Sequence, residues 1–260
     1  MKKIFVVLMS LLSVQFAFAQ DSSKIDKKEI RRERINVVAK QQEEGVNTYT
    51  KHFLGGIKLS TDGYGAFLEI GRAKSVRKAL LFQFEISEKK HQKEDKFFDP
   101  SVTAEPIIYG KINYVYPVKL GVQQQFLLGN KGNKNGVNVT ANVGGGLNLA
   151  LLRPYFLQVD VNGERKFVNY NSSDSVAFLS GPFYAAPGIG TGWNKLNVVP
   201  GIYVKPALRF DYGIFNEGVS AVEVGFVAEY FTKGIPQVIY NKEQKLFFSA
   251  FVAVIFGKRK

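Results

Sequence analysis

The chain has 260 residues, of which 45% are hydrophobic, 13% aromatic and 22% charged, and its formal net charge is +13. This composition is typical of a folded protein with one sizeable domain or two small ones, and it excludes a disordered chain. A bundle of membrane-spanning helices is also excluded, because the mean hydropathy is −0.07 and no later segment reaches about 18 consecutive apolar residues.

The N-terminal segment MKKIFVVLMSLLSVQFAFAQ predicts a cleaved secretory signal peptide over residues 1–19. Two lysines precede the apolar stretch 4–12, and the small-residue motif AFA stands just before Gln20, as in a cleavage site. Gln15 interrupts the apolar run that a membrane anchor would need. Export argues against nucleic acid as the partner of this basic chain, and the absence of cysteine excludes stabilising disulfides.

Residues 20–49 form a charged segment in which basic and acidic side chains alternate. We expect it to be helical or disordered and to lie in the periplasm, because its apolar residues are too sparse for a strong amphipathic stripe. A solvated spacer and a partner-binding helix over 21–44 are both compatible with this pattern.

From residue 50 onward, short alternating segments are separated by Gly, Asn, Asp and Pro, which is typical of antiparallel strands. No helical segment stands between them, so a parallel βαβ fold is excluded. We expect an all-β, antiparallel up-and-down barrel over residues 50–257 with about ten strands, and eight or twelve are alternatives. The ten predicted strands are 53–60, 64–72, 79–87, 107–116, 119–128, 137–151, 155–161, 201–212, 219–231 and 245–256.

The sequence VNVTANVGGGLNLALL, residues 137–152, shows most clearly that the two faces of a strand differ. Its odd positions are apolar or glycine, whereas its even positions begin with Asn, Thr and Asn, so the period is two and the chain is extended. In a soluble barrel the apolar face would point inward. In a membrane barrel it would point outward to lipid, with the polar face lining the lumen.

Connection lengths favour the membrane barrel. The odd-numbered connections are about 3, 19, 8, 39 and 13 residues long and the even-numbered ones about 6, 2, 3 and 6, which resembles the sorting of long external loops and short periplasmic turns. The long connection 162–200 is rich in aromatics, and we expect it to fold over or into the barrel mouth.

Polar side chains gathered inside a narrow barrel would pair across it, because an unpaired buried charge is costly. Tyrosines near the predicted strand ends fit bilayer interfaces and further favour an apolar exterior. The predicted lumen network comprises Lys58, Glu69, Glu85, Lys111, Asp160, Lys205, Arg209, Asp211, Glu223 and Glu229.

The AFA cleavage motif, the alternating strands and the terminal segment KLFFSAFVAVIF together resemble the small outer-membrane β-barrels of Gram-negative bacteria. The resemblance covers roughly residues 50–257 and is architectural. It implies a monomer in the cell outer membrane with outer-membrane lipids around it. Residues 258–260 follow the barrel as a basic tail.

The predicted periplasmic turns carry many basic residues and one acidic residue, Glu217. Such a rim would contact phospholipid headgroups or an acidic periplasmic protein, or would only keep the turns soluble. The predicted basic periplasmic rim comprises Arg72, Lys74, Arg77, Lys78, Lys119, Arg153, Lys258, Arg259 and Lys260.

No motif predicts an enzyme, a cofactor or a metal. The two histidines, His52 and His91, are expected at opposite ends of the barrel, and neither belongs to a nucleophile motif. The sequence therefore favours a non-enzymatic outer-membrane barrel with a structural or narrow-pore role. Two alternatives remain open: an accessory barrel of envelope assembly or secretion with a periplasmic partner, and a soluble exported barrel that binds an apolar ligand.

Overall fold

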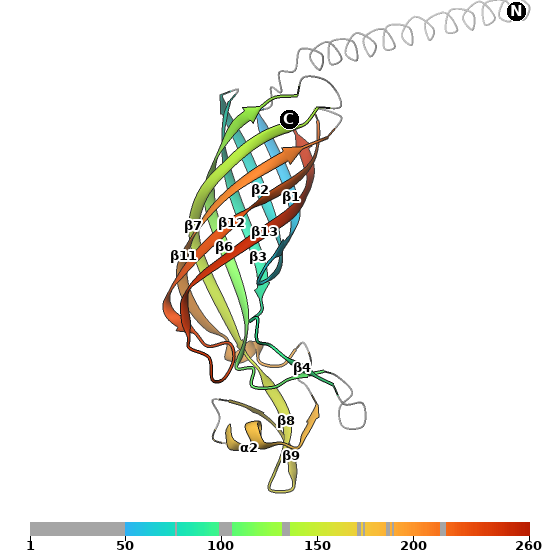
Figure 1. Cartoon of the computed structure of the whole chain (residues 1–260), viewed down its shortest axis with the longest axis vertical. Helices are drawn as coiled ribbons and strands as arrows, with labels where there is room; N and C mark the ends of the chain where they lie inside the picture. The colour runs from blue at the N-terminus through green and yellow to red at the C-terminus, as the bar shows by residue number, and fades with distance from the viewer. Residues whose placement is uncertain are drawn as a thin grey trace, which may run out of the picture.

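The structure is a computed structural model that describes residues 50–75, 77–98, 106–131, 136–170, 173, 175–185, 188, 190–213 and 217–260. The predicted signal peptide and the charged segment 20–49 lie outside these residues. Within the described ranges, eight antiparallel strands close into one barrel in the ring order β1-β13-β12-β11-β7-β6-β3-β2 (Figure 1). The barrel strands are β1 (Lys51–Ser60), β2 (Gly63–Ser75), β3 (Lys78–Lys89), β6 (Asn113–Gly129), β7 (Asn138–Pro154), β11 (Asn197–Asp211), β12 (Gly218–Ile235) and β13 (Gln244–Arg259).

The prediction of ten barrel strands is wrong, and the alternative of eight is the observed number. The predicted segments 107–116 and 119–128 are largely one strand, because β6 runs without a break through Pro117. Pro117 pairs with Ala150 of β7, and the ladder to β3 has no pair at this position. The missing amide of proline therefore falls where the ladder is open, and the strand continues.

The predicted strand 155–161 exists as β8 (Phe156–Val161), but it lies outside the barrel wall. It forms a hairpin with β9 (Glu164–Asn169). Asn162 and Gly163 connect the two strands, and both have positive φ, as the twist of a two-residue hairpin requires.

The first and last barrel strands, β1 and β13, are hydrogen-bonded neighbours, so the start of β1 and the end of β13 lie at the same end of the barrel. We call this end the terminal end; it also carries the short connection between β2 and β3. The long connections 90–112 and 155–196 lie at the other end, which we call the capped end (Figure 1). The predicted connection 129–136 was expected on the side of the long loops, whereas the connection between β6 and β7 lies at the terminal end.

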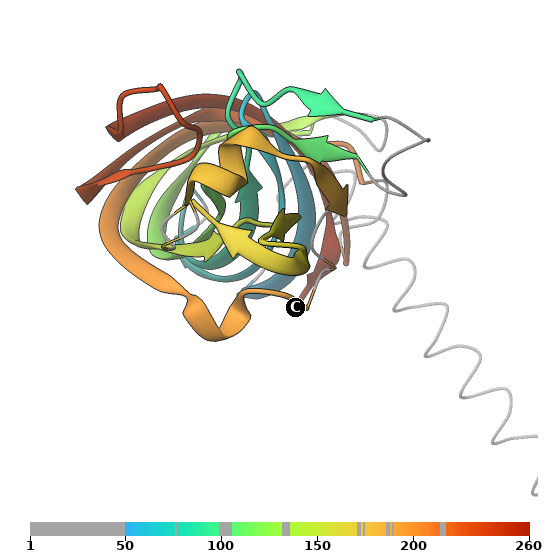
Figure 2. The same cartoon turned by 90° about the horizontal axis from the view of Figure 1, so that it is seen from below.

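The long connections build a folded cap over the barrel mouth (Figure 2). Tyr155, Leu157 and Phe178 are buried together with Ile107 and Ile239, which brings three connections into one apolar cluster. The expectation that 162–200 folds over the mouth agrees with this arrangement. The cap elements are β4 (Lys96–Phe97), β5 (Ile107–Ile108), β8, β9, α2 (Ser175–Ser180), β10 (Phe183–Ala185) and the 3-10 helix η1 (Trp193–Lys195).

The barrel wall is apolar outside and polar inside. Along β7, Val143 and Leu147 are exposed on the outer face, whereas Asn142 and Asn148 are buried inside. The same alternation holds along β11 and β12.

None of the described helices combines the length and the apolar character that crossing a bilayer would require.

Candidate functional site: the ion pairs inside the barrel and its two ends

One cluster of charges in the barrel is organised by Arg209, a residue that is only 2% exposed. Its Nη1 and Nη2 each donate to one carboxylate oxygen of Glu69 at 2.7 Å. Its Nε donates to Glu223 Oε2 at 2.8 Å. Glu223 stands beside Arg209 on the neighbouring strand, whereas Glu69 reaches it from β2 on another part of the ring. The guanidinium therefore ties strands together across the lumen.

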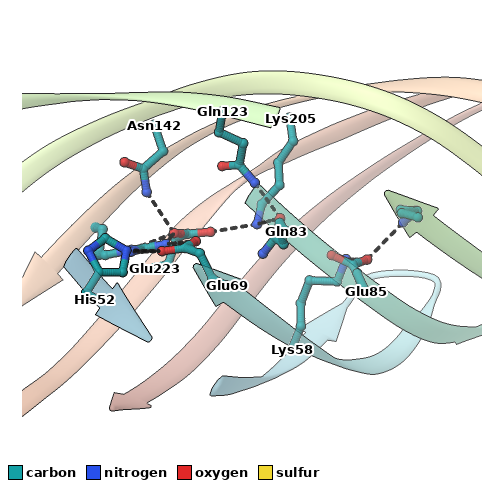
Figure 3. Close-up of polar contacts among 11 residues, drawn as sticks. His52, Lys58, Glu69, Gln83, Glu85, Gln123, Asn142, Lys205 and Glu223 are labelled. Carbon is teal, nitrogen blue, oxygen red and sulfur yellow. Dashed lines mark hydrogen bonds and ion pairs between the residues drawn. The ribbon is translucent and has the colours of Figure 1, made fainter. Parts of the chain in front are cut away.

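A second cation, Lys205, extends this cluster along the barrel (Figure 3). Its ammonium lies 2.8 Å from Glu223 Oε1 and donates to Gln83 Oε1 at 3.2 Å. Gln123 also donates to Gln83, and Asn142 donates to Glu223 at 3.0 Å. Neutral side-chain amides thus donate hydrogen bonds to the same oxygen atoms that the cations contact.

A second group of charges lies toward the capped end. Lys119 reaches Glu85 at 3.0 Å and Glu229 at 2.5 Å, while Lys58 pairs with Glu85. Lys89 contacts Glu229 at 2.6 Å. Each carboxylate of this group has two cations beside it, so the buried charges are compensated.

Apolar side chains pack among these ion pairs. Phe67 and Phe251 are buried, and Lys205 lies over both rings at 5.1 Å and 4.8 Å from their centroids. Tyr203 is buried in the same cluster and faces the lumen. The interior is therefore filled with side chains, as in other barrels of this strand number.

Most of the predicted lumen residues are buried inside the barrel and belong to the groups just described. Asp211 lies further toward the terminal end, 2.6 Å from Arg259. The predicted residues found inside the barrel are Lys58, Glu69, Glu85, Lys205, Arg209, Asp211, Glu223 and Glu229.

Two predicted lumen residues are placed elsewhere, because the segments that carry them are not barrel strands. Asp160 is on β8 in the cap and accepts a hydrogen bond from the Gly163 amide. Lys111 stands in the connection before β6 and contacts Glu94 at 2.8 Å. Burial lowers the pKa of Lys111, and the Glu94 carboxylate opposes this shift.

Two predicted rim residues were also assigned wrongly. Lys119 is inside the barrel, because Pro117 does not end the strand. Arg153 lies at the capped end of β7, since residues 151–155 are not a turn at the terminal end. The rim residues that do lie at the terminal end are Arg72, Lys74, Arg77, Lys78, Lys258, Arg259 and Lys260.

Sequence reasoning missed two members of the interior network. His52 Nε2 lies 3.1 Å from Glu69 Oε1, and Lys89 joins Glu229 to Asp62. His52 is an even number of residues from Lys58, and Lys89 is an even number of residues from Glu85. Each therefore points inward on the same strand face as a residue that was assigned correctly. The signal was therefore present at the strand ends, beyond the predicted boundaries.

Arg153 joins the barrel wall to the cap. Its guanidinium lies 4.3 Å from the ring centroid of Tyr114 and 5.2 Å from that of Trp193. Tyr116 stacks on Trp193 at 5.6 Å. A stack of this kind holds η1 against the start of β6 and end of β7.

The geometry around His91 gives no support for a catalytic pair. Its Nδ1 accepts from the Lys93 amide at 3.1 Å, and Glu94 accepts from the His91 amide at 3.0 Å. Among the residues that the structure describes, no three His, Asp or Glu side chains gather as ligands for a metal ion.

No protein-family model matches the chain, and no curated protein matches it. Its structural neighbours are small outer-membrane β-barrels of Gram-negative bacteria. The N-terminal barrel of OprF from Pseudomonas aeruginosa is 10% identical, with a TM-score of 0.38, and the match covers 80% of this chain and 98% of that one. Ail from Yersinia pestis is 8% identical, with a TM-score of 0.39 over 82% and 100% of the two chains.

Neisserial surface protein A is 11% identical, with a TM-score of 0.37, and the match covers 80% of this chain and 95% of that one. Identities and TM-scores of this size carry no information about activity or location. What this chain does must therefore be inferred from its own geometry.

Proposed function

We propose that this chain is an integral, non-enzymatic protein of the outer membrane whose barrel anchors the folded cap at the cell surface. The observation that carries the proposal is the inverted distribution of side chains. Arg209, Glu69 and Glu223 are buried in the middle of the barrel, while Ile57, Phe226 and Phe248 on the wall are more than half exposed.

This inversion is unfavourable in water. A monomeric soluble protein rarely exposes a continuous apolar surface beyond a few hundred Å², and each Å² left in water forgoes roughly 25 cal/mol. In a bilayer the same surface contacts acyl chains, and closing the ring leaves no unpaired strand edge. The wall is therefore matched to lipid.

The filled interior favours a structural role over a narrow pore. Arg209, Lys205 and Lys119 bridge carboxylates from several strands, so an ion moving along the axis would have to displace paired charges. It also disfavours a soluble barrel with an apolar ligand, because the polar network occupies the space such a ligand would need.

The first test compares two exposed valines. Val252 is 50% exposed on the outer face of β13, and Val176 is 76% exposed on α2 in the cap. We expect Val252→Arg to weaken folding into zwitterionic vesicles by about 2–4 kcal/mol. Val176→Arg should change this free energy by less than about 0.5 kcal/mol. Urea titration followed by tryptophan fluorescence measures this free energy. Heat-dependent gel mobility shows whether the barrel has folded.

A soluble barrel would tolerate an arginine equally at both exposed positions. Equal free energies for the two variants, or a monomer that stays dissolved without detergent, would contradict the proposal. Single-channel recordings on the folded protein should show no steady conductance steps. A regular conductance in the wild-type barrel would restore the narrow-pore alternative.

A further inference from the structure

At the terminal end, the outward-facing side chains of four neighbouring strands are basic. The strands β13, β1, β2 and β3 follow one another around the ring. On each of them every second residue points outward. These outward residues are mostly apolar along the wall and are basic at the terminal end. These outward-facing cations are Lys258 on β13, Lys51 on β1, Arg72 and Lys74 on β2, and Lys78 on β3.

Three cations stand directly opposite one another across three strands. Lys51 pairs with Arg72 in the ladder between β1 and β2. On its other side Lys51 exchanges two backbone hydrogen bonds of 2.8 Å with Lys260. We call Lys260, Lys51 and Arg72 the basic row; all three are exposed.

Among the residues that the structure describes, the basic row has no acidic partner. Like charges directly opposite in a sheet destabilise it. Of the ion pairs formed by described residues, none includes a member of the row. Asp211, a buried carboxylate at this end, forms an ion pair with Arg259 instead. An external anion would remove this repulsion.

The remaining four barrel strands do not share this feature. Their outer faces end at the terminal end in Leu128 on β6, Val137 before β7, Tyr212 after β11 and Ser220 on β12. Lys131, in the connection after β6, donates to the Gly213 carbonyl. Among the described residues at this end, the outward cations are thus confined to one arc of the wall.

An apolar hollow of about 510 Å³ lies in the outer wall next to this arc. Phe53, Ile70 and Phe82 line it from the arc strands, and Leu120 and Gly145 line it from β6 and β7. Phe53 and Ile70 each stand two residues from a member of the row on the same strand face, roughly 7 Å along the strand. The missing side chain of Gly145 deepens the wall there.

We propose that this arc binds one anionic phospholipid, with its phosphate over the basic row and an acyl chain in the hollow. The site rests on the proposed membrane insertion. Arginine and lysine bind phosphate oxygens well, and the row lies where the apolar wall ends, which is the headgroup level. An acidic protein in water would meet the rim along the barrel axis, whereas these side chains point sideways from the wall.

The experiment first folds the protein into pure phosphatidylcholine vesicles, where failure would count against the proposed function itself. It then uses vesicles with equal phosphatidylglycerol and phosphatidylcholine, mild detergent extraction and native mass spectrometry of retained lipid. We expect the wild-type barrel to retain phosphatidylglycerol preferentially. The variant Lys51→Gln/Arg72→Gln/Lys260→Gln should lose this preference roughly 100-fold, because each basic residue contributes about fivefold.

The control variant Lys233→Gln/Lys242→Gln/Lys245→Gln removes the same charge from exposed residues near the capped end. It should keep the wild-type preference. Val122→Trp, which fills the hollow without changing charge, should reduce retention of phosphatidylglycerol several-fold.

Two results would overturn the site. One is equal retention of both lipids by a wild-type barrel that has inserted normally. The other is an equal loss of preference in the row variant and in the control, which would reduce the effect to net charge. Binding of poly-glutamate by the row without lipid preference would instead indicate an acidic protein partner.

Discussion

At the scale of single residues, the interior depends on charges that have fixed partners. Arg209 meets Glu69 and Glu223 from two other strands, and Gly71 leaves room for the neighbouring His52. A Cβ on Gly71 would lie 2.1 Å from the His52 ring, so a larger residue would displace the imidazole from Glu69. The glycine at position 71 and the contact between His52 and Glu69 are therefore coupled.

Arg209→Ala should be strongly destabilising, because it leaves two buried carboxylates without their guanidinium. We expect a loss of about 3–5 kcal/mol in the free energy of unfolding, measured by urea titration in vesicles. Arg165→Ala, an exposed position in the cap, serves as the control and should change it by less than about 0.5 kcal/mol. Similar losses in both variants would show that the interior pairs contribute little.

At the scale of elements, the alternation of side chains predicted correctly which face of most strands points outward, since period two leaves only two choices. It did not predict the number of strands. Pro117 suggested a turn, yet its missing amide falls where the ladder to β3 is open. The alternation of β8 is real, but its inward face, Leu157 and Val159, packs in the cap. The Asn162-Gly163 pair was the sequence signal for that hairpin.

Tyr155, which is 1% exposed, connects the cap to the barrel mouth. Its hydroxyl accepts from the Ile108 amide at 3.0 Å, and its ring packs on Tyr114 and Phe178. We expect Tyr155→Ala to cost about 3–5 kcal/mol locally and to expose the cap to protease added outside vesicles. The barrel should remain heat-modifiable on gels. We expect the cap and the barrel to be separately stable, and loss of the barrel together with the cap would contradict this expectation.

At the scale of the whole molecule, closure brings together residues that no local pattern relates. Arg209 and Glu69 are 140 positions apart in the chain, and only the ring and its narrow interior make them partners. The sequence therefore predicted most of the charges that lie inside, and it could not predict the pairs. Nor did it predict the basic row, because that depends on β13 lying beside β1.

The chain contains no cysteine, so single cysteines can report which end faces outward. We expect Val176→Cys in the cap to react with a membrane-impermeant maleimide on intact cells. Lys74→Cys at the terminal end should react only after lysis. Labelling of Lys74→Cys on intact cells, with Val176→Cys protected, would reverse the orientation.

The pairing of β1 with β13 has a consequence for how such a protein is made. Strand β1 finds one of its two neighbours only in β13, the last of the barrel strands in chain order. Until β13 is present, the sheet has two unpaired edge strands that can pair with any extended peptide nearby. If the barrel assembles in a membrane as we propose, the incomplete polypeptide must therefore be kept from pairing with other chains until β13 is present.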